Sequence, residues 1–155
     1  MRLTTPSRLG LSALGLLSLL ATSCDSLGPE RSELERARAL WEATGPSDYS
    51  YAVERLCFCG YTGPARVTVE DGEVVSVVSL TEQQPPIEPS EDLFPSVDGL
   101  FDILEDAMAR DAHSITATYD PETGVPVEFF IDYQEFTVDE ELGMRVTEGV
   151  TPLEP

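Results

Sequence analysis

The fold is decided by residues 49–78, which read YSYAVERLCFCGYTGPARVTVEDGEVVSVV. Apolar residues alternate through much of this stretch, and a period of two indicates strands that bury one face. The pair Asp71-Gly72 lies between two such runs and predicts a two-residue hairpin turn. Residues 60–64 contain two glycines and a proline, which predict a second turn. The stretch therefore predicts three consecutive antiparallel strands.

Helices are predicted on both sides of these strands. Residues 32–44 open with the capping-box sequence Ser-Glu-Leu-Glu and then repeat apolar residues at helical spacing. Residues 97–108 carry an apolar stripe at positions i, i+3, i+4, i+7 and i+11, preceded by Pro95 and Ser96. Between the two halves, residues 81–90 hold three prolines and are expected to form a surface loop.

The C-terminal half repeats the pattern of a helix followed by strands. Residues 114–119 and 127–133 alternate, and the turn at residues 120–124 ends in a glycine that suits a positive φ. Residues 134–143 form a long acidic connection, and residues 144–147 are expected to be a short last strand. The order suggests two similar α-β-β-β halves. We expect an α+β, two-layer domain whose antiparallel sheet carries both helices on one face.

The N-terminus has the pattern of an export signal. Arg2 and Arg8 give the first eight residues a positive charge. Residues 9–20 then form an apolar run that is too short to span a bilayer but typical of a signal peptide. Residues 20–24, LATSC, resemble a bacterial lipobox, with Ala21 where leucine is usual. We expect Cys24 to be lipidated and to become the new N-terminus. The alternative is ordinary signal cleavage that leaves Cys24 as a free thiol.

The chain is expected to hold one domain. Residues 1–23 are the lipoprotein signal peptide, residues 24–31 the lipidated N-terminus and tether, residues 32–148 the single α+β domain, and residues 149–155 a C-terminal tail. A chain of 155 residues is long enough for one hydrophobic core. The predicted location is the periplasmic or cell-surface face of a bacterial membrane.

The chain is strongly acidic, with 29 acidic residues against 9 basic ones, all arginine, and a formal charge of −20. Loss of residues 1–23 would remove two arginines and no acid, which makes the charge −22. Such a surface repels nucleic acid and anionic lipid headgroups, so no nucleic-acid partner is expected. It suits a soluble, monomeric domain and leaves cationic partners open, although a solvated acidic surface needs no partner at all.

Cys57 and Cys59 are the only residues with a chemistry of their own. Export to an oxidising compartment favours a disulfide between them. Two residues along a strand place the Cα atoms about 6.6 Å apart, near the upper limit for a bridge, so the backbone must bend, and Gly60 allows this. A thiol-exchanging pair and a thiolate metal site are the alternatives. The Cys-x-Cys spacing and the distant sole histidine, His113, favour neither.

No catalytic motif stands out. The sequence lacks the nucleophile elbow, the zinc-protease motif and the phosphate loop. His113 has no nucleophile motif beside it. Asp132 and residues 139–141 are candidate calcium ligands, but the EF-hand spacing is absent. We therefore assign no catalytic residue, no metal site and no cofactor, and we expect the protein not to be an enzyme.

A set of short motifs is spread over residues 40–146. The motifs are Asp48-Tyr49-Ser50-Tyr51, Cys57-Phe58-Cys59, Gly63-Pro64, Val67-Thr68-Val69, Asp71-Gly72, Leu100-Phe101-Asp102, Tyr119-Asp120-Pro121, Gly124-x-Pro126 and Ile131-Asp132-Tyr133. Together they resemble an uncharacterised family of bacterial exported proteins and lipoproteins, a domain of unknown function. The resemblance implies an envelope location and a cysteine pair that belongs together, and it implies no established activity.

The sequence therefore favours a non-enzymatic, lipid-anchored envelope module. It would attach to the membrane through Cys24 and bind an unknown protein or small-molecule partner, or support envelope assembly. One alternative is a thiol-active protein that uses Cys57 and Cys59. Another is an inhibitor of an exported enzyme, which rests on analogy between the paired halves and small inhibitory proteins.

Overall fold

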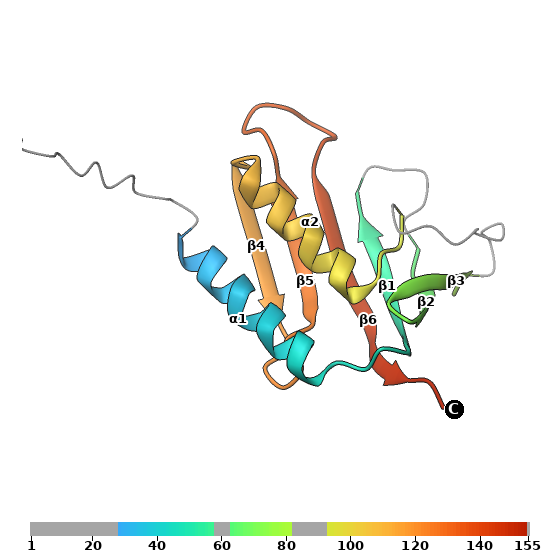
Figure 1. The fold of residues 1–155 in the computed structure, drawn as a ribbon. Helices are drawn as coiled ribbons and strands as arrows, with labels where there is room; N and C mark the ends of the chain where they lie inside the picture. The colour runs from blue at the N-terminus through green and yellow to red at the C-terminus, as the bar shows by residue number, and fades with distance from the viewer. Residues whose placement is uncertain (1–27, 58–62, 82–92, 155) are drawn as a thin grey trace, which may run out of the picture.

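The computed structural model describes residues 28–57, 63–81 and 93–154. The elements are α1 (Gly28–Thr44), β1 (Tyr49–Leu56), β2 (Ala65–Glu70), β3 (Glu73–Ser79), α2 (Val97–Ala109), β4 (Ser114–Tyr119), β5 (Pro126–Asp132) and β6 (Leu142–Pro152). This order confirms the predicted succession of one helix and three strands, twice over (Figure 1). The predicted signal peptide, Cys24, Cys59 and nearly all of the predicted loop at residues 81–90 lie outside the described residues.

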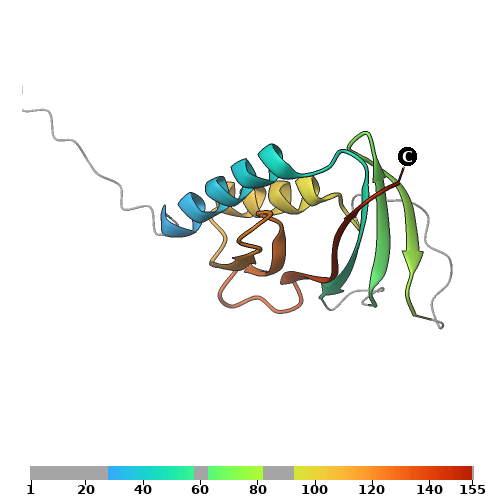
Figure 2. The same ribbon diagram turned by 90° about the horizontal axis from the view of Figure 1, so that it is seen from below.

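All six strands form one antiparallel sheet in the order β3-β2-β1-β6-β5-β4. Each half contributes a meander of three strands, and the two meanders join where β1 pairs with β6. Both helices lie on the same side of the sheet (Figure 2). The predicted α+β architecture, with two helices on one face of an antiparallel sheet, is confirmed.

The hairpin β2–β3 forms where the sequence predicts it. Asp71 and Gly72 have φ values of 52° and 81°, so both turn residues adopt the left-handed conformation of a tight hairpin. The carboxylate of Asp48 accepts a hydrogen bond from the Asp71 backbone N–H at 2.8 Å, which ties the turn to the start of β1.

Helix α1 begins earlier than predicted. The capping box places the first turn at Ser32, whereas the helix starts at Gly28. The Ser32 hydroxyl donates to the Gly28 carbonyl oxygen at 2.9 Å, so Ser32 lies inside the helix and does not cap it. Residues 28–31, expected in the tether, are therefore helical. The predicted end at Thr44 is confirmed. Of the apolar residues at helical spacing, Leu34, Ala37 and Trp41 are buried and Leu40 is partly exposed.

The last strand is the largest departure from the prediction. The sequence predicts a short strand at residues 144–147 and a loose tail at residues 149–155, whereas β6 continues to Pro152. The end of β6 pairs with the start of β1, where Pro152 lies opposite Tyr49. Residues 148–152 include a glycine and a proline, which weaken a local strand signal, so pairing with β1 supplies the stability instead.

Two tyrosines of β1 hold the start of α2. Tyr49 and Tyr51 are each 1% exposed. The Tyr49 hydroxyl accepts a hydrogen bond from the Val97 backbone N–H at 2.9 Å, and the Tyr51 hydroxyl donates to the Pro95 carbonyl oxygen. Burial raises the pKa of Tyr51 well above its ordinary value. The Ser96 side chain caps the first turn of α2, as the sequence predicts.

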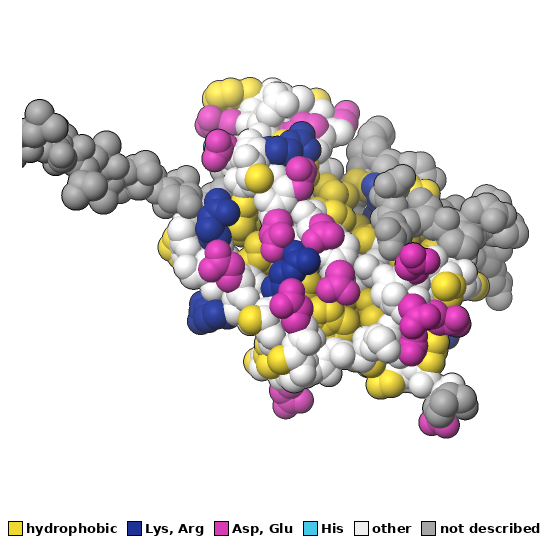
Figure 3. Space-filling view, viewed as in Figure 1, with side chains coloured by type: hydrophobic (Ala, Val, Ile, Leu, Met, Phe, Trp, Pro, Cys, Tyr) yellow, Lys and Arg dark blue, Asp and Glu magenta, His cyan; other side chains and the backbone are white. Residues whose placement is uncertain are grey.

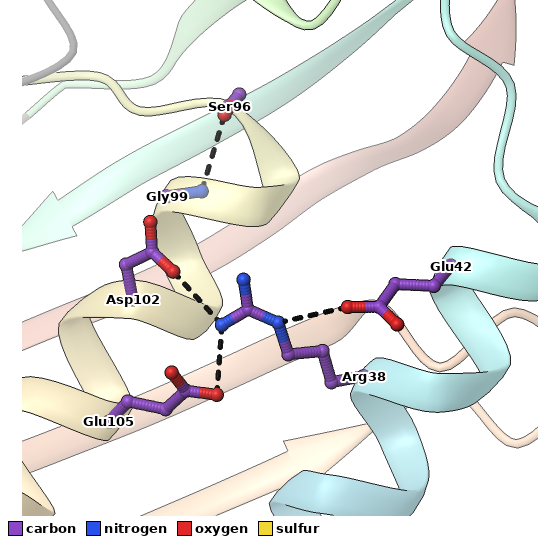
Figure 4. A network of polar contacts seen from close by, with 6 residues as sticks. All are labelled: Arg38, Glu42, Ser96, Gly99, Asp102 and Glu105. Carbon is purple, nitrogen blue, oxygen red and sulfur yellow. Dashed lines mark hydrogen bonds and ion pairs between the residues drawn. The ribbon is translucent and has the colours of Figure 1, made fainter.

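Arg38 connects the two helices (Figure 4). Its guanidinium lies 2.9 Å from the Asp102 carboxylate and 2.8 Å from the Glu105 carboxylate, both on α2, and 3.3 Å from Glu42 on α1. It also lies 5.8 Å from the centre of the Phe101 ring. Partial burial lowers the pKa of Arg38, but the hydrogen bonds to the two α2 carboxylates outweigh this and raise it. Asp102 and Glu105 are largely exposed on α2, and through Arg38 they also join the two helices.

Candidate interaction surface

The sheet has one face that no element of the described residues covers (Figure 2). We call it the outer face. Residues opposite one another in a β-ladder point to the same side, so the register defines its side chains as rows that cross the strands. Three rows matter here: Thr118-Glu128-Arg145-Glu54, Thr116-Phe130-Gly143-Leu56, and Glu148-Ala52-Arg66-Val78.

The first row centres on Arg145 of β6. Its guanidinium makes two hydrogen bonds of 3.1 Å to the Glu128 carboxylate on β5 and one of 2.9 Å to Glu54 on β1. The hydrogen bond to Arg145 lowers the pKa of Glu128, and the same contact raises the pKa of Arg145. Exposed ion pairs add little stability, so the main effect is to align three strands where the two halves meet.

In the third row, long charged side chains cover an alanine, which is why this alanine is buried on an otherwise open face. Ala52 is 0% exposed although it points away from the helices. Its two cross-strand neighbours are Arg66 on β2 and Glu148 on β6, and these form an ion pair with each other. Because alanine is short, the ion pair can pass directly above it. The pair therefore ties β2 to β6 across β1.

The second row is apolar. Phe130 is 42% exposed and its ring lies beside Gly143. A Cβ atom at position 143 would come within 2.9 Å of Leu56 Cβ and 3.1 Å of Phe130 Cδ2. The glycine therefore lets the phenylalanine and the leucine approach each other across β6. Next to this row, the surface of β4 and β5 is hollowed into a depression of about 330 Å³ that Thr116, Thr118, Glu128 and Phe130 help to line.

Residues 133–141, which we call the β5–β6 loop, are held by their own hydrogen bonds. The Glu140 carboxylate accepts from the backbone N–H groups of Tyr133, at 3.1 Å, and Gln134, at 2.8 Å. The Gln134 carbonyl oxygen accepts from the Thr137 N–H at 3.0 Å. The Glu140 carboxylate therefore joins the two ends of the loop and fixes its conformation.

The tip of this loop presents apolar side chains to solvent. Phe136 is 91% exposed and Val138 is 78% exposed. The sequence predicts only an acidic connection at residues 134–143, and these two exposed side chains were not predicted. The signal that could have found them is an aromatic residue and a valine two positions apart inside an otherwise acidic loop.

The cysteine pair predicted from the sequence lies only partly within the described residues. Cys57 directly follows β1 and is half-buried, and Cys59 is not described. Leu56 lies opposite Gly143 at the start of β6, so Cys57 is at the same end of the sheet as the β5–β6 loop. The disulfide, the redox alternative and the lipid on Cys24 all remain predictions.

The other residues weighed from the sequence do not converge. His113 is exposed in the turn before β4. Asp132 and Glu140 both use a carboxylate oxygen to accept backbone N–H groups. Within the described ranges, no three histidine, cysteine or acidic side chains are grouped as metal ligands would be. Neither helix in those ranges combines the length and the apolar character needed to cross a bilayer.

A comparison with protein families gives one match. The model of a family of unknown function, DUF6174, matches residues 33–150, from the first half of α1 to near the end of β6. The match covers most of the chain, so the chain belongs to this family, and it includes both α-β-β-β halves. No curated protein and no solved structure matches the chain.

Proposed function

We propose that this member of the family is a non-enzymatic binding module, lipid-anchored at Cys24 to a bacterial membrane, which recognises a protein partner through its outer face. The observation that carries the proposal is the uncovered face itself, where the exposed Phe130 lies next to the row of paired charges formed by Glu128, Arg145 and Glu54. Apolar side chains surrounded by satisfied polar groups are the usual composition of a protein interface.

The shape of the face favours a macromolecule over a small molecule. Small ligands are normally enclosed by deep apolar pockets, whereas the depression beside Phe130 is shallow and lies on a strand surface. Six strands at about 4.8 Å spacing make a face about 24 Å wide. A face of that width leaves room for a protein partner to contact several strands at once.

The anchor would keep the domain close to the membrane. Cys24 precedes the first helical residue, Gly28, by four positions. Four residues span at most about 14 Å when fully extended, so a lipid on Cys24 would leave little freedom to reach distant partners. We therefore expect the partner to be another envelope protein.

The test compares two arginine substitutions at exposed positions. Thr116→Arg lies on the outer face, and Ala43→Arg lies on α1 at the opposite side of the molecule. The full-length lipoprotein and each variant are recovered from the membrane of the producing bacterium, and co-purified proteins are quantified by mass spectrometry. Thr116→Arg should lose the partner and Ala43→Arg should retain it. Equal retention by both variants would exclude the outer face.

A second comparison distinguishes the binding module from the thiol-active alternative. Replacing Cys57 and Cys59 by serine should leave partner binding within about twofold of the parent if the cysteines only support the fold nearby. A loss of the cellular phenotype in a variant that still folds and still binds would favour thiol chemistry instead.

A further inference from the structure

The β5–β6 loop extends the outer face, and we propose that it anchors the partner by inserting Phe136 into an apolar pocket that lysine and arginine border. The inference rests on the proposed function and specifies the chemistry of the partner: a protein with a basic surface. Three observations carry it, namely the order of the loop, the exposure of its tip and its charge.

The loop is ordered before any partner is present. Glu140 closes it by accepting hydrogen bonds from Tyr133 and Gln134, and Asp139 adopts a positive φ of 67°. Aspartate visits the left-handed region more readily than most residues, so the order of the loop rests on the hydrogen bonds to Glu140. Order of this kind lowers the entropy cost of binding, because the loop does not have to be fixed by the partner.

The tip presents a concentrated apolar surface. A single exposed apolar side chain is common on proteins and needs no explanation. Here Phe136 and Val138 are 91% and 78% exposed within one short loop, and Phe130 on the strand that leads into it is 42% exposed. The loop bends toward the side of the sheet that faces away from the helices (Figure 2). The tip and the outer face can therefore contact the same partner.

The charge around the tip selects among partners. Residues 133–141 contain four acids, Glu135, Asp139, Glu140 and Glu141, and no basic residue. Arg110, just after α2, lies 4.6 Å from the centre of the Tyr133 ring, and its charge is paired with Asp106 at 3.2 Å. Acidic side chains also predominate over the helix side of the molecule (Figure 3).

This charge disfavours two other occupants of the tip. An anionic membrane would repel the loop, and so would a second copy of a chain with a formal charge of −20. A basic protein surface would attract it and accelerate association at low ionic strength. Aromatic residues are enriched at the cores of protein interfaces, and interface hot spots lie in well-packed, desolvated pockets.

The experiment places a photoreactive p-benzoylphenylalanine at one of three positions of the full-length lipoprotein in the producing bacterium. The positions are those of Phe136 at the tip, Thr116 on the outer face and Ala43 on α1. After irradiation, the crosslinked species and the crosslinked peptides are identified by mass spectrometry. All three residues are exposed, so the substitutions should not impair folding.

The inference predicts a crosslink from position 136 to a protein whose crosslinked site is a concave apolar surface lined by lysine or arginine. With that protein purified, Phe136→Ala should weaken binding by about 30-fold and Phe136→Leu by clearly less. Raising the salt concentration should weaken binding of the parent, and Glu135→Gln with Asp139→Asn should reduce this salt dependence.

Other outcomes overturn the inference in distinguishable ways. A crosslink from position 116 but not from position 136 would leave the outer face as the binding surface and remove the role of the loop. A phospholipid crosslinked at position 136 would make the loop a membrane contact, and a product of twice the mass of the chain would make it a self-association contact. Crosslinks from position 43 alone would contradict both the inference and the proposed function.

Discussion

At the scale of single residues, small side chains determine how closely neighbouring strands, and the sheet and the helices, can approach one another. Gly143 leaves room for Phe130 and Leu56 on either side of β6, and Ala52 lets an ion pair pass above β1. Gly124, in the turn between β4 and β5, touches α1 so closely that a Cβ atom there would lie 2.1 Å from the Ala37 carbonyl oxygen. The sequence predicts the positive φ of Gly124, observed at 81°, but it cannot predict the contact with a helix more than eighty residues earlier.

Gly124→Ala should destabilise the fold strongly, because the new methyl group meets the α1 backbone as well as an unfavourable φ. Gly72→Ala is the matched control, since Gly72 has the same φ of 81° and open space around it. Urea unfolding should show a loss of about 1 kcal/mol for Gly72→Ala and at least about 2 kcal/mol more for Gly124→Ala. Equal losses would mean that the turn does not press on α1.

Tyr119 makes the stability sensitive to alkaline pH. Its ring stacks on Phe101 with centroids 6.4 Å apart, and burial together with the charge of Glu33 raises its pKa to about 12. A pKa raised in the folded state means that the stabilisation is complete below about pH 10 and is lost as the pH rises through 12. Tyr119→Phe removes this ionisation and keeps the ring.

The free energy of unfolding of Tyr119→Phe should therefore fall less than that of the parent between pH 9 and pH 11.5, measured by urea unfolding at both values. Absorbance titration of the folded parent and of Tyr119→Phe should differ by one tyrosinate signal, and the signal that the variant lacks should have its midpoint near pH 12. A missing signal centred on the ordinary tyrosine value would contradict the burial of this hydroxyl.

At the scale of elements, local signals were predictable and distant pairings were not. The Asp71-Gly72 turn and the apolar stripe of α2 are encoded within a few residues, and both are confirmed. The pairing of β1 with β6 joins residues about one hundred positions apart, and no local pattern reveals it. The capping box at Ser32 is a local signal that proved wrong. The helix begins at Gly28, and the Ser32 hydroxyl bonds the Gly28 carbonyl oxygen instead of capping the helix.

The paired end of β6 should be needed for stability. A chain that stops after Glu148 loses the residues that pair with the start of β1, whereas a chain that stops after Leu153 keeps them. Thermal and urea unfolding should show the shorter chain destabilised by about 2 kcal/mol or more, because several backbone hydrogen bonds are lost. The longer chain should match the parent. Equal stability of the two chains would restore the prediction of a loose tail at residues 149–155.

Arg38 should stabilise the helix layer in a salt-dependent way. Arg38→Met keeps part of the packing and removes the cation between Asp102 and Glu105. Arg36→Met is the matched control, because it removes the same charge from the same helix. The Arg36 side chain donates a hydrogen bond to the Ser32 carbonyl oxygen on its own helix. Urea unfolding at low salt should show Arg38→Met about 1 kcal/mol less stable than Arg36→Met. The difference should shrink in 0.5 M NaCl, as screening weakens the pairs.

At the scale of the whole molecule, the arrangement of the two halves creates the candidate surface. Each half buries one face of its strands, and joining β1 to β6 makes one broad sheet whose other face stays open. The sequence predicts the two layers, because the helical stripes and strand alternation each require one buried face. It does not predict the outer-face rows, because Leu56, Gly143 and Phe130 come from three strands that meet only in the folded sheet.

We propose that the outer face and the β5–β6 loop are occupied where the protein works. Hydroxyl-radical footprinting tests this by comparing the protein in intact cells that produce it with the purified protein. We expect Phe130 and Phe136 to be oxidised much more slowly in the cells, and the partly exposed Leu40 and Ile103 on the helices to be oxidised equally in both samples. Equal oxidation of the two phenylalanines in both samples, or protection of the helices alone, would contradict it.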